Sequence, residues 1–306
     1  MDWLTRMNAA LAYVEENLDG AIDYETMAKI ACCSSHNFIR MFSFITDVSL
    51  SEYVRRRRLT LAALELQNSG TKVIDVAVKY GYDSPVSFAW AFLQLHGVTP
   101  SEARAEGVNL KAYPKMSFQI QIKGEKEMDY RIETKEAFKV FGIERTCKEE
   151  EVELIDTIDG VDIGMVDNLW EASGEAEKLK ADAGDLPSFV SKSLGKAHVV
   201  FNYRKTDPGT FPSMLFAFQG PTSKTEGYTM VDIPSHTWAI FPSGKHPVSE
   251  QDAVVEAMNK RIYAEWFPAS SYELVDGLEM EIYGGDKENS YVEIWLAVRK
   301  KLITAR

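Results

Sequence analysis

Cysteine is scarce in this sequence, and its three cysteines have no spacing that would support a metal site or a set of disulfides. Cys32 and Cys33 are adjacent and Cys147 is alone, so the chain has no C-x-x-C pair. Zinc sites and disulfide frameworks both require repeated cysteine spacings. The histidines also lack metal-ligand spacing; they are His36, His96, His198, His236 and His246. We therefore expect reduced thiols and no bound metal or other cofactor.

Long apolar segments are missing as well. No run of about 18 apolar residues occurs, and the N-terminal segment MDWLTRMNAALAYVEENL contains the charges of Asp2, Arg6 and Glu15. This segment has the character of neither a signal peptide nor a membrane span. We expect a cytoplasmic protein without a membrane partner.

The motifs that identify several enzyme classes are absent too. The chain contains no G-x-S-x-G nucleophile elbow, no phosphate-binding P-loop and no dinucleotide-binding glycine pattern. We therefore assign no catalytic residues and expect that the protein is not an enzyme.

Positive charge is in short supply, which limits any interaction with nucleic acid. The chain has 34 Lys and Arg against 46 Asp and Glu, a formal net charge of -12, and residues 1–106 alone have 10 against 13. DNA binding would therefore depend on a local basic surface. The segment RRRR at 55–58 is such a surface, and we predict phosphate contacts by Arg55 and Arg57. The alternative is an ordinary solvated helix surface.

A nine-residue pattern occurs twice in the first third of the chain. SSHNFIRMF at 34–42 and SPVSFAWAF at 84–92 both begin with serine and have phenylalanine at the fifth and ninth places. A short helical segment and a tight turn precede each copy, and a long helix from about Leu50 to Gln67 joins them. This order predicts two helix-turn-helix units, which can place their second helices in successive major grooves, about 34 Å apart.

Within each copy, the serine is the expected N-cap and the phenylalanines are expected core residues, so the side chains between them should face outward. These outward side chains are the predicted DNA contacts. They are Ser35, His36, Asn37, Ile39 and Arg40 in the first helix and Val86, Ser87 and Trp90 in the second.

Residues 1–106 resemble the AraC/XylS-type DNA-binding domain. The resemblance rests on the two segments above, on their order and spacing over about 100 residues, and on an ending that matches Gly-x-x-Pro-x-x-x-Arg, formed by Gly97, Pro100 and Arg104. It implies double-stranded DNA as a partner, with base contacts from both second helices. RNA polymerase is a further candidate partner.

Two positions depart from that family pattern. Cys32 stands where the first turn usually has glycine, which costs about 1 kcal/mol if the residue is left-handed. Trp90 stands where arginine is common, so one bidentate guanine contact is unavailable. We therefore predict that the first helix reads bases through Arg40 and His36, and that the second contributes phosphate contacts and shape recognition.

The remaining sequence predicts a second domain of a different class. We expect a linker at 107–127 and an α+β domain at 128–306, behind the all-α double helix-turn-helix domain. This domain contains the order strand, helix, strand, strand twice. The expected elements are 130–146, 164–183, 197–205 and 213–220 in the first half, and 228–244, 249–267, 278–285 and 290–298 in the second.

This second domain resembles the GyrI-like small-molecule-binding domain. The resemblance rests on IPSHTWAIFPSG, EWFPASSYELVDGLEMEIYGG and YVEIWLAV, in this order. It implies an effector site between two similar halves, walled by aromatic residues, with a glutamate on a late strand that maps to Glu293. The expected aromatic walls are Trp170, Tyr203, Trp238, Trp266, Tyr291 and Trp295.

Strand alternation agrees with that assignment. In SYVEIWLAV, Tyr291, Glu293 and Trp295 fall on one face of the strand, so a carboxylate lies between two aromatic side chains. Such a site suits a small cationic or aromatic organic molecule. Ordinary core packing for the tryptophans and a solvated position for Glu293 are the competing interpretations.

Three functions compete at this point. The first is a ligand-responsive DNA-binding transcription regulator. The second is a hydrolase of a small reactive molecule, in which Glu293 with Tyr203 or Tyr263 would supply acid and base groups. The third is a sequestering protein that binds another protein rather than DNA. The joint presence of both domain patterns favours the regulator.

Overall fold

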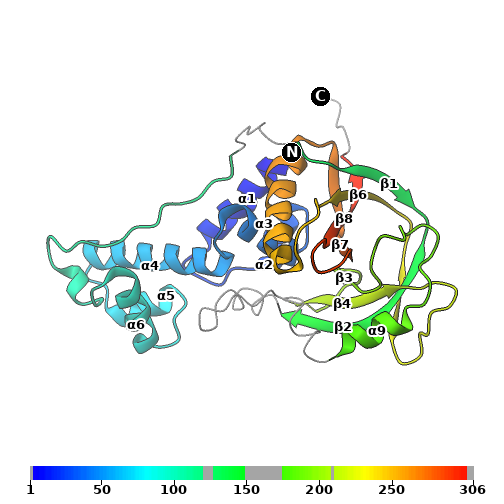
Figure 1. The fold of residues 1–306 in the computed structure, drawn as a ribbon. Helices are drawn as coiled ribbons and strands as arrows, with labels where there is room; N and C mark the ends of the chain where they lie inside the picture. Colours follow the sequence, from blue (N-terminus) through cyan, green and yellow to red (C-terminus); the bar gives the residue numbers. More distant parts are fainter. Residues whose placement is uncertain (1–2, 120–126, 149–173, 208–209, 302–306) are drawn as a thin grey trace. The chain divides into compact units, whose positions relative to one another are not determined.

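A computed structural model of the chain describes residues 3–119, 127–148, 174–207 and 210–301 (Figure 1). The chain divides into two compact units. One comprises residues 1–32 and 46–119, and the other comprises residues 33–45 and 120–306. The second unit therefore includes most of one helix from the N-terminal third of the sequence.

The first unit consists of helices. They are α1 (Trp3–Glu16), α2 (Tyr24–Ala31), α4 (Leu50–Asn68), α5 (Val73–Lys79), α6 (Pro85–His96) and the short 3-10 helix η1 (Glu102–Arg104). The predicted core role of the second pair of phenylalanines is confirmed, since Phe88 and Phe92 are fully buried among residues of α4 and α5. Residues 107–119 run without helix or strand, and Asn8 of α1 binds both backbone groups of Phe118.

Each of the two helix-turn-helix turns contains a left-handed residue. Cys32, which ends α2, has φ 57° and ψ 42°, and Gly81 after α5 has φ 80°. The condition attached to the cost of Cys32 is therefore met, because this non-glycine residue is left-handed. Arg104 donates hydrogen bonds to the carbonyl oxygens of Leu66, Ser69 and Thr71, so this arginine caps the end of the long helix α4.

The second unit contains an eight-stranded antiparallel sheet. Its order is β1-β6-β8-β7-β3-β4-β2-β5. The strands are β1 (Arg131–Lys135), β2 (Phe138–Lys148), β3 (His198–Phe201), β4 (Thr210–Phe218), β5 (Thr229–Ile233), β6 (His236–Pro242), β7 (Tyr272–Gly284) and β8 (Tyr291–Lys300).

The sheet is made of two similar halves, which confirms the predicted repeat. The chain order β2-α9-β3-β4 is repeated as β6-α10-β7-β8, and β3 and β7 meet at the centre of the sheet. Of the helix predicted at 164–183, the described part is α9 (Glu175–Asp182). The predicted strand 130–146 is divided into β1, which is one edge strand of the sheet, and β2, which lies next to the other edge strand, β5.

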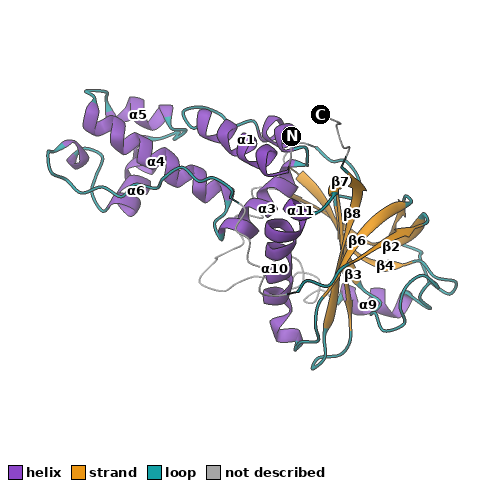
Figure 2. Ribbon diagram, turned by 90° about the horizontal axis from the view of Figure 1, so that it is seen from above, coloured by secondary structure: helices purple, strands orange, loops and turns teal. Residues whose placement is uncertain are grey.

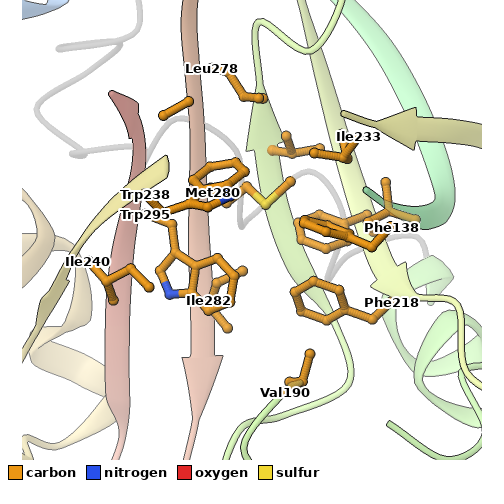
Figure 3. Packing of buried hydrophobic residues seen from close by; sticks show 14 of the residues in the cluster. Phe138, Val190, Phe218, Ile233, Trp238, Ile240, Leu278, Met280, Ile282 and Trp295 are labelled. Carbon is orange, nitrogen blue, oxygen red and sulfur yellow. The ribbon is translucent and has the colours of Figure 1, made fainter. Parts of the chain in front are cut away.

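Helices cover one face of the sheet. Figure 2 shows α3 (Ser35–Thr46), α10 (Gln251–Arg261) and α11 (Phe267–Ala269) on the same side of the strands. A π-helical turn, η3 (Ile262–Trp266), joins α10 to α11. The other face bears a large cluster of aromatic and aliphatic side chains, to which β2, β4, β6, β7 and β8 all contribute (Figure 3). We call this cluster the aromatic face.

No helix within the described ranges combines the length and the apolar character that crossing a membrane requires.

Candidate functional site

The second helix-turn-helix unit exposes its predicted contact residues. Ser84 caps α6 as expected, since its hydroxyl accepts a hydrogen bond from the Ser87 N–H at 3.0 Å. Val86 is 78% exposed and Trp90 is 65% exposed, and Ser87 is also exposed. Because α6 contains no lysine or arginine, this surface offers apolar contact rather than charge.

The first recognition helix, α3, has the opposite character. Arg40 is 9% exposed, and Ser35, Asn37 and Ile39 are also buried. The expectation that these side chains face outward is therefore wrong for this structure. The physical reason is visible for Arg40 and Asn37, which lie against β7 of the sheet in the second unit. His36 belongs to α3, but its side chain is outside the described part.

The arginine run on α4 is largely committed to internal contacts. Arg57 donates to both carboxylate oxygens of Glu15, at 2.9 and 2.8 Å, and to the Tyr113 carbonyl at 2.6 Å. Burial raises the pKa of Glu15, but the hydrogen bonds from Arg57 and Tyr53 outweigh it and hold that pKa below its ordinary value. Arg57 thus holds the helical unit together, and its phosphate contact stays a prediction.

Arg55 is more available than Arg57. It pairs with Glu52 one turn earlier on α4, at 2.6 and 2.9 Å, in a partly exposed position. An exposed pair of this kind contributes about 0.3–0.5 kcal/mol, so a phosphate could displace Glu52 at little cost.

The aromatic face assembles several of the predicted ligand residues. Trp238 on β6 and Trp295 on β8 are fully buried, with ring centroids 5.9 Å apart. Phe218 lies 6.1 Å from Trp295, and Phe138 lies 6.3 Å from Trp238. Figure 3 shows these four rings facing one another from four strands. Tyr203 and Tyr291 pack on the same cluster.

Glu293 lies on this face among three donors, as the strand alternation predicted for two of them. The Tyr291 hydroxyl donates at 2.6 Å, the Trp295 indole N–H at 2.7 Å and Arg131 of β1 at 2.8 Å. Burial raises the pKa of Glu293, yet the hydrogen bonds from Arg131, Tyr291 and Trp295 outweigh burial and hold the pKa below its ordinary value. Glu293 is therefore an ionised carboxylate at neutral pH.

The carboxylate is accompanied by two internal cations that the sequence did not predict. Arg131 pairs with both Glu293 and Glu133. The Lys135 ammonium lies 4.6 Å from the centroid of Trp295 and 2.7 Å from Glu133. The four charges cancel, and Lys135 occupies the kind of position over an aromatic ring that a bound organic cation would take.

One donor on this face has no hydrogen-bond partner among the described residues. The indole N–H of Trp238 is buried and makes no hydrogen bond within the described part of the chain. A buried N–H without a partner is unfavourable, so an acceptor on a bound molecule would be stabilised there.

Two predicted wall residues lie elsewhere. Trp266 belongs to η3 and packs with Phe241, Tyr130 and Tyr272, on the side of the sheet that the helices cover. Its prediction as a wall of the aromatic face is wrong, because strand alternation places Phe241 opposite the aromatic face. Trp170 lies outside the described residues.

The acid–base pairs predicted for a hydrolase, Glu293 with Tyr203 or Tyr263, do not form. Tyr203 donates to Glu144 at 2.7 Å, and Tyr263 lies beside Glu279 on the covered face. The tyrosine partner of Glu293 is Tyr291. Among the described residues, no group of three or more His, Cys, Asp or Glu side chains could hold a metal ion.

Arg131 and Lys135 could have been noticed from the sequence, because RIETK alternates charged residues with Ile132 and Thr134. Their target could not, since β1 pairs with β6 about 100 residues further along the chain. The partners of Arg40 on β7 were hidden for the same reason.

Comparisons with known proteins agree with both parts of this description. Residues 27–106 match a family model described as a helix-turn-helix domain, and residues 128–299 match one described as a GyrI-like small molecule binding domain.

Curated relatives match the N-terminal third. The Transposon Tn10 TetD protein of Escherichia coli is 37% identical over 100 residues, which is 33% of this chain and 72% of that protein. The HTH-type transcriptional activator AarP of Providencia stuartii is 38% identical over 91 residues, covering 30% and 67%. Regulatory protein SoxS of Escherichia coli K12 is 34% identical over 94 residues, covering 31% and 88%. The chain therefore belongs to the AraC-type transcription regulators, with a GyrI-like small-molecule-binding domain at its C-terminal end, and is a ligand-responsive DNA-binding regulator.

Proposed function

We propose that the effector of this regulator is an organic cation with aromatic groups, and that it binds on the aromatic face beside Glu293. The single observation that carries the proposal is the buried, ionised carboxylate of Glu293 next to Trp295 and Trp238. Aromatic rings attract a cation through their negative faces, and a desolvated carboxylate adds direct charge attraction. In this proposal the ligand cation takes over the position of Lys135 above Trp295.

Binding without chemical conversion is part of this proposal. Glu293 is held ionised by three donors, which suits a fixed counter-charge better than a group that exchanges protons. The regulator would act in the cytoplasm, where its DNA target lies, and RNA polymerase would be its further partner.

We also propose that DNA is read unequally by the two units. Arg40, Asn37 and His36 would contact base edges from α3, while Val86, Ser87 and Trp90 would pack on sugars and thymine methyl groups from α6. Support for the second part comes from the exposure of Trp90 and the lack of cations on α6.

Tetraphenylphosphonium, a cation with four aromatic rings, is a suitable probe of the effector site. Calorimetric titration of the full chain should show binding that Glu293→Gln weakens at least tenfold. Glu273→Gln is the matched control, because Glu273 also pairs with an arginine but lies on the far part of β7, beside Arg299. Equal affinities of the wild type and Glu293→Gln would remove Glu293 from the site.

A further inference from the structure

Arg40 belongs to a recognition helix, yet its guanidinium is held on the C-terminal sheet. Nη1 donates to Glu279 Oε2 at 3.0 Å and Nη2 donates to Glu279 Oε1 at 3.3 Å. Glu281 contributes a second carboxylate, 3.8 Å from Nη2. Arg40 is 9% exposed and Glu279 is 1% exposed. A guanidinium bound in this way has no free fork of donors for a guanine.

Aromatic side chains complete the surface that receives α3. The Arg40 guanidinium lies 4.9 Å from the ring of Phe201 and 5.4 Å from that of Phe44. Phe44, on the same helix, stacks almost parallel on Tyr263 with centroids 6.4 Å apart. The receiving surface is therefore formed by η3, β3 and β7, and we call it the α3 receptor.

Asn37 makes the docked arrangement incomplete. Both polar atoms of its side chain are buried without a hydrogen-bond partner in the described part of the chain. They lie against Gly277, where an added Cβ would be 2.1 Å from Asn37 Nδ2. A buried amide without partners is unfavourable, whereas an adenine edge in the major groove offers an asparagine both a donor and an acceptor. Docking therefore withholds from Asn37 the partners that DNA would supply.

The receptor and the aromatic face share one strand. Glu279 and Glu281 point from β7 toward α3, and the alternating residues Met280 and Ile282 belong to the aromatic face (Figure 3). A molecule that rearranges the aromatic face acts directly on the strand that holds Arg40.

We propose that the α3 receptor is an internal competitor of DNA, which keeps the first recognition helix from reading bases until α3 is released. The inference rests on the proposed role of Arg40 and Asn37 in DNA reading. When α3 is released, Arg40 exchanges its ion pairs with Glu279 and Glu281 for a contact with a guanine. Asn37 then gains hydrogen-bond partners from a base edge for its side-chain amide. Because β7 also contributes to the aromatic face, the effector shifts the equilibrium between docked and released α3. Any effect of the ligand on DNA affinity therefore depends on Glu279 and Glu281.

The test compares DNA affinities of variants of the 306-residue chain. A labelled duplex is first selected from a random pool with wild type and with the Glu279→Gln/Glu281→Gln double variant. Affinity is then measured by fluorescence anisotropy at about 150 mM salt, where non-specific attraction is weak. Without carboxylates the buried Arg40 has no counter-charge, so docking is disfavoured. We expect the double variant to bind at least tenfold more tightly than wild type, and Glu273→Gln to bind like wild type.

Two further variants make the result specific. Arg40→Ala in the double-variant background should remove the gain. Gly277→Ala leaves all charges in place but pushes on Asn37, and should also tighten binding; it decides the question if the double variant does not fold, as judged by its melting curve. If wild type binds DNA specifically and neither the double variant nor Gly277→Ala binds more tightly, the α3 receptor does not compete with DNA. That result would leave the regulator function standing. Absence of specific binding in every variant would overturn the proposed DNA reading and the receptor together.

Discussion

Cys32→Gly should stabilise the protein, although it removes a side chain. Cys32 is left-handed, with φ 57° and ψ 42°, a conformation that costs a non-glycine residue about 1–2 kcal/mol. The Cys32 side chain is exposed, so little packing is lost. Glycine costs about 0.5–1 kcal/mol more conformational entropy on folding. The difference predicts a gain of up to about 1.5 kcal/mol, with a central value of about 0.75 kcal/mol.

The equivalent turn of the second unit supplies the opposite perturbation. Gly81→Ala places a Cβ at φ 80° and 2.7 Å from Arg58 Nη1, whose guanidinium binds the carbonyl oxygens of Leu18 and Gly20. We expect a loss of about 1–2 kcal/mol from the backbone alone, and more if Arg58 is displaced. Gly70→Ala, with no atom within 4 Å of the new Cβ, is the control and should change stability by under about 0.5 kcal/mol.

Thermal unfolding followed by far-ultraviolet circular dichroism measures all three variants. A change of about 1 kcal/mol corresponds to a shift of a few degrees in Tm for a unit of this size. The reasoning is refuted if the Tm of Cys32→Gly is below that of wild type while the Tm of Gly81→Ala equals that of wild type.

Three other predictions follow from the site and the core. Burial lowers the pKa of His198 from 6.5 to about 3, so this imidazole stays neutral in the folded state at pH values where it binds a proton in the unfolded state. The free energy of unfolding should therefore be highest above pH 6.5 and fall by about 1.4 kcal/mol per pH unit below about pH 6. His198→Asn, which keeps an acceptor for the Tyr283 N–H, should flatten this part of the urea-unfolding profile, and an unchanged slope would contradict the assignment. Lys135→Met should raise the affinity for tetraphenylphosphonium severalfold in titration, because it removes the internal cation above Trp295; a lower affinity would show that Lys135 does not compete. In the Glu279→Gln/Glu281→Gln background, where Arg40 is released, Trp90→Ala should weaken binding to the selected duplex less than Arg40→Ala, measured by anisotropy, and the reverse order would assign base reading to the second unit.

The local features of the fold were predictable because they depend on short-range physical chemistry. Ser84 as N-cap and the buried Phe88 and Phe92 both follow from residue type and helical spacing. The neighbourhood of Glu293 with Tyr291 and Trp295 follows from strand alternation in the same way.

Features that depend on distant pairing were not predictable. The burial of Arg40 is set by the carboxylate of Glu279, 239 residues away, whereas helical periodicity alone assigns that position to solvent. Arg131 reaches Glu293 only because β1 pairs with β6, next to β8. The position of Trp266 depends on which sheet face the helix containing it covers, which its own segment does not specify.

Selection from random duplexes at about 150 mM salt tests the central claim most directly. Random duplexes are selected in parallel with the wild-type chain and with its Glu279→Gln/Glu281→Gln variant, and the bound DNA is sequenced. The account predicts enrichment of a motif with one well-defined half and a looser half about ten base pairs away, stronger for the variant. Random sequence in both selections would contradict it.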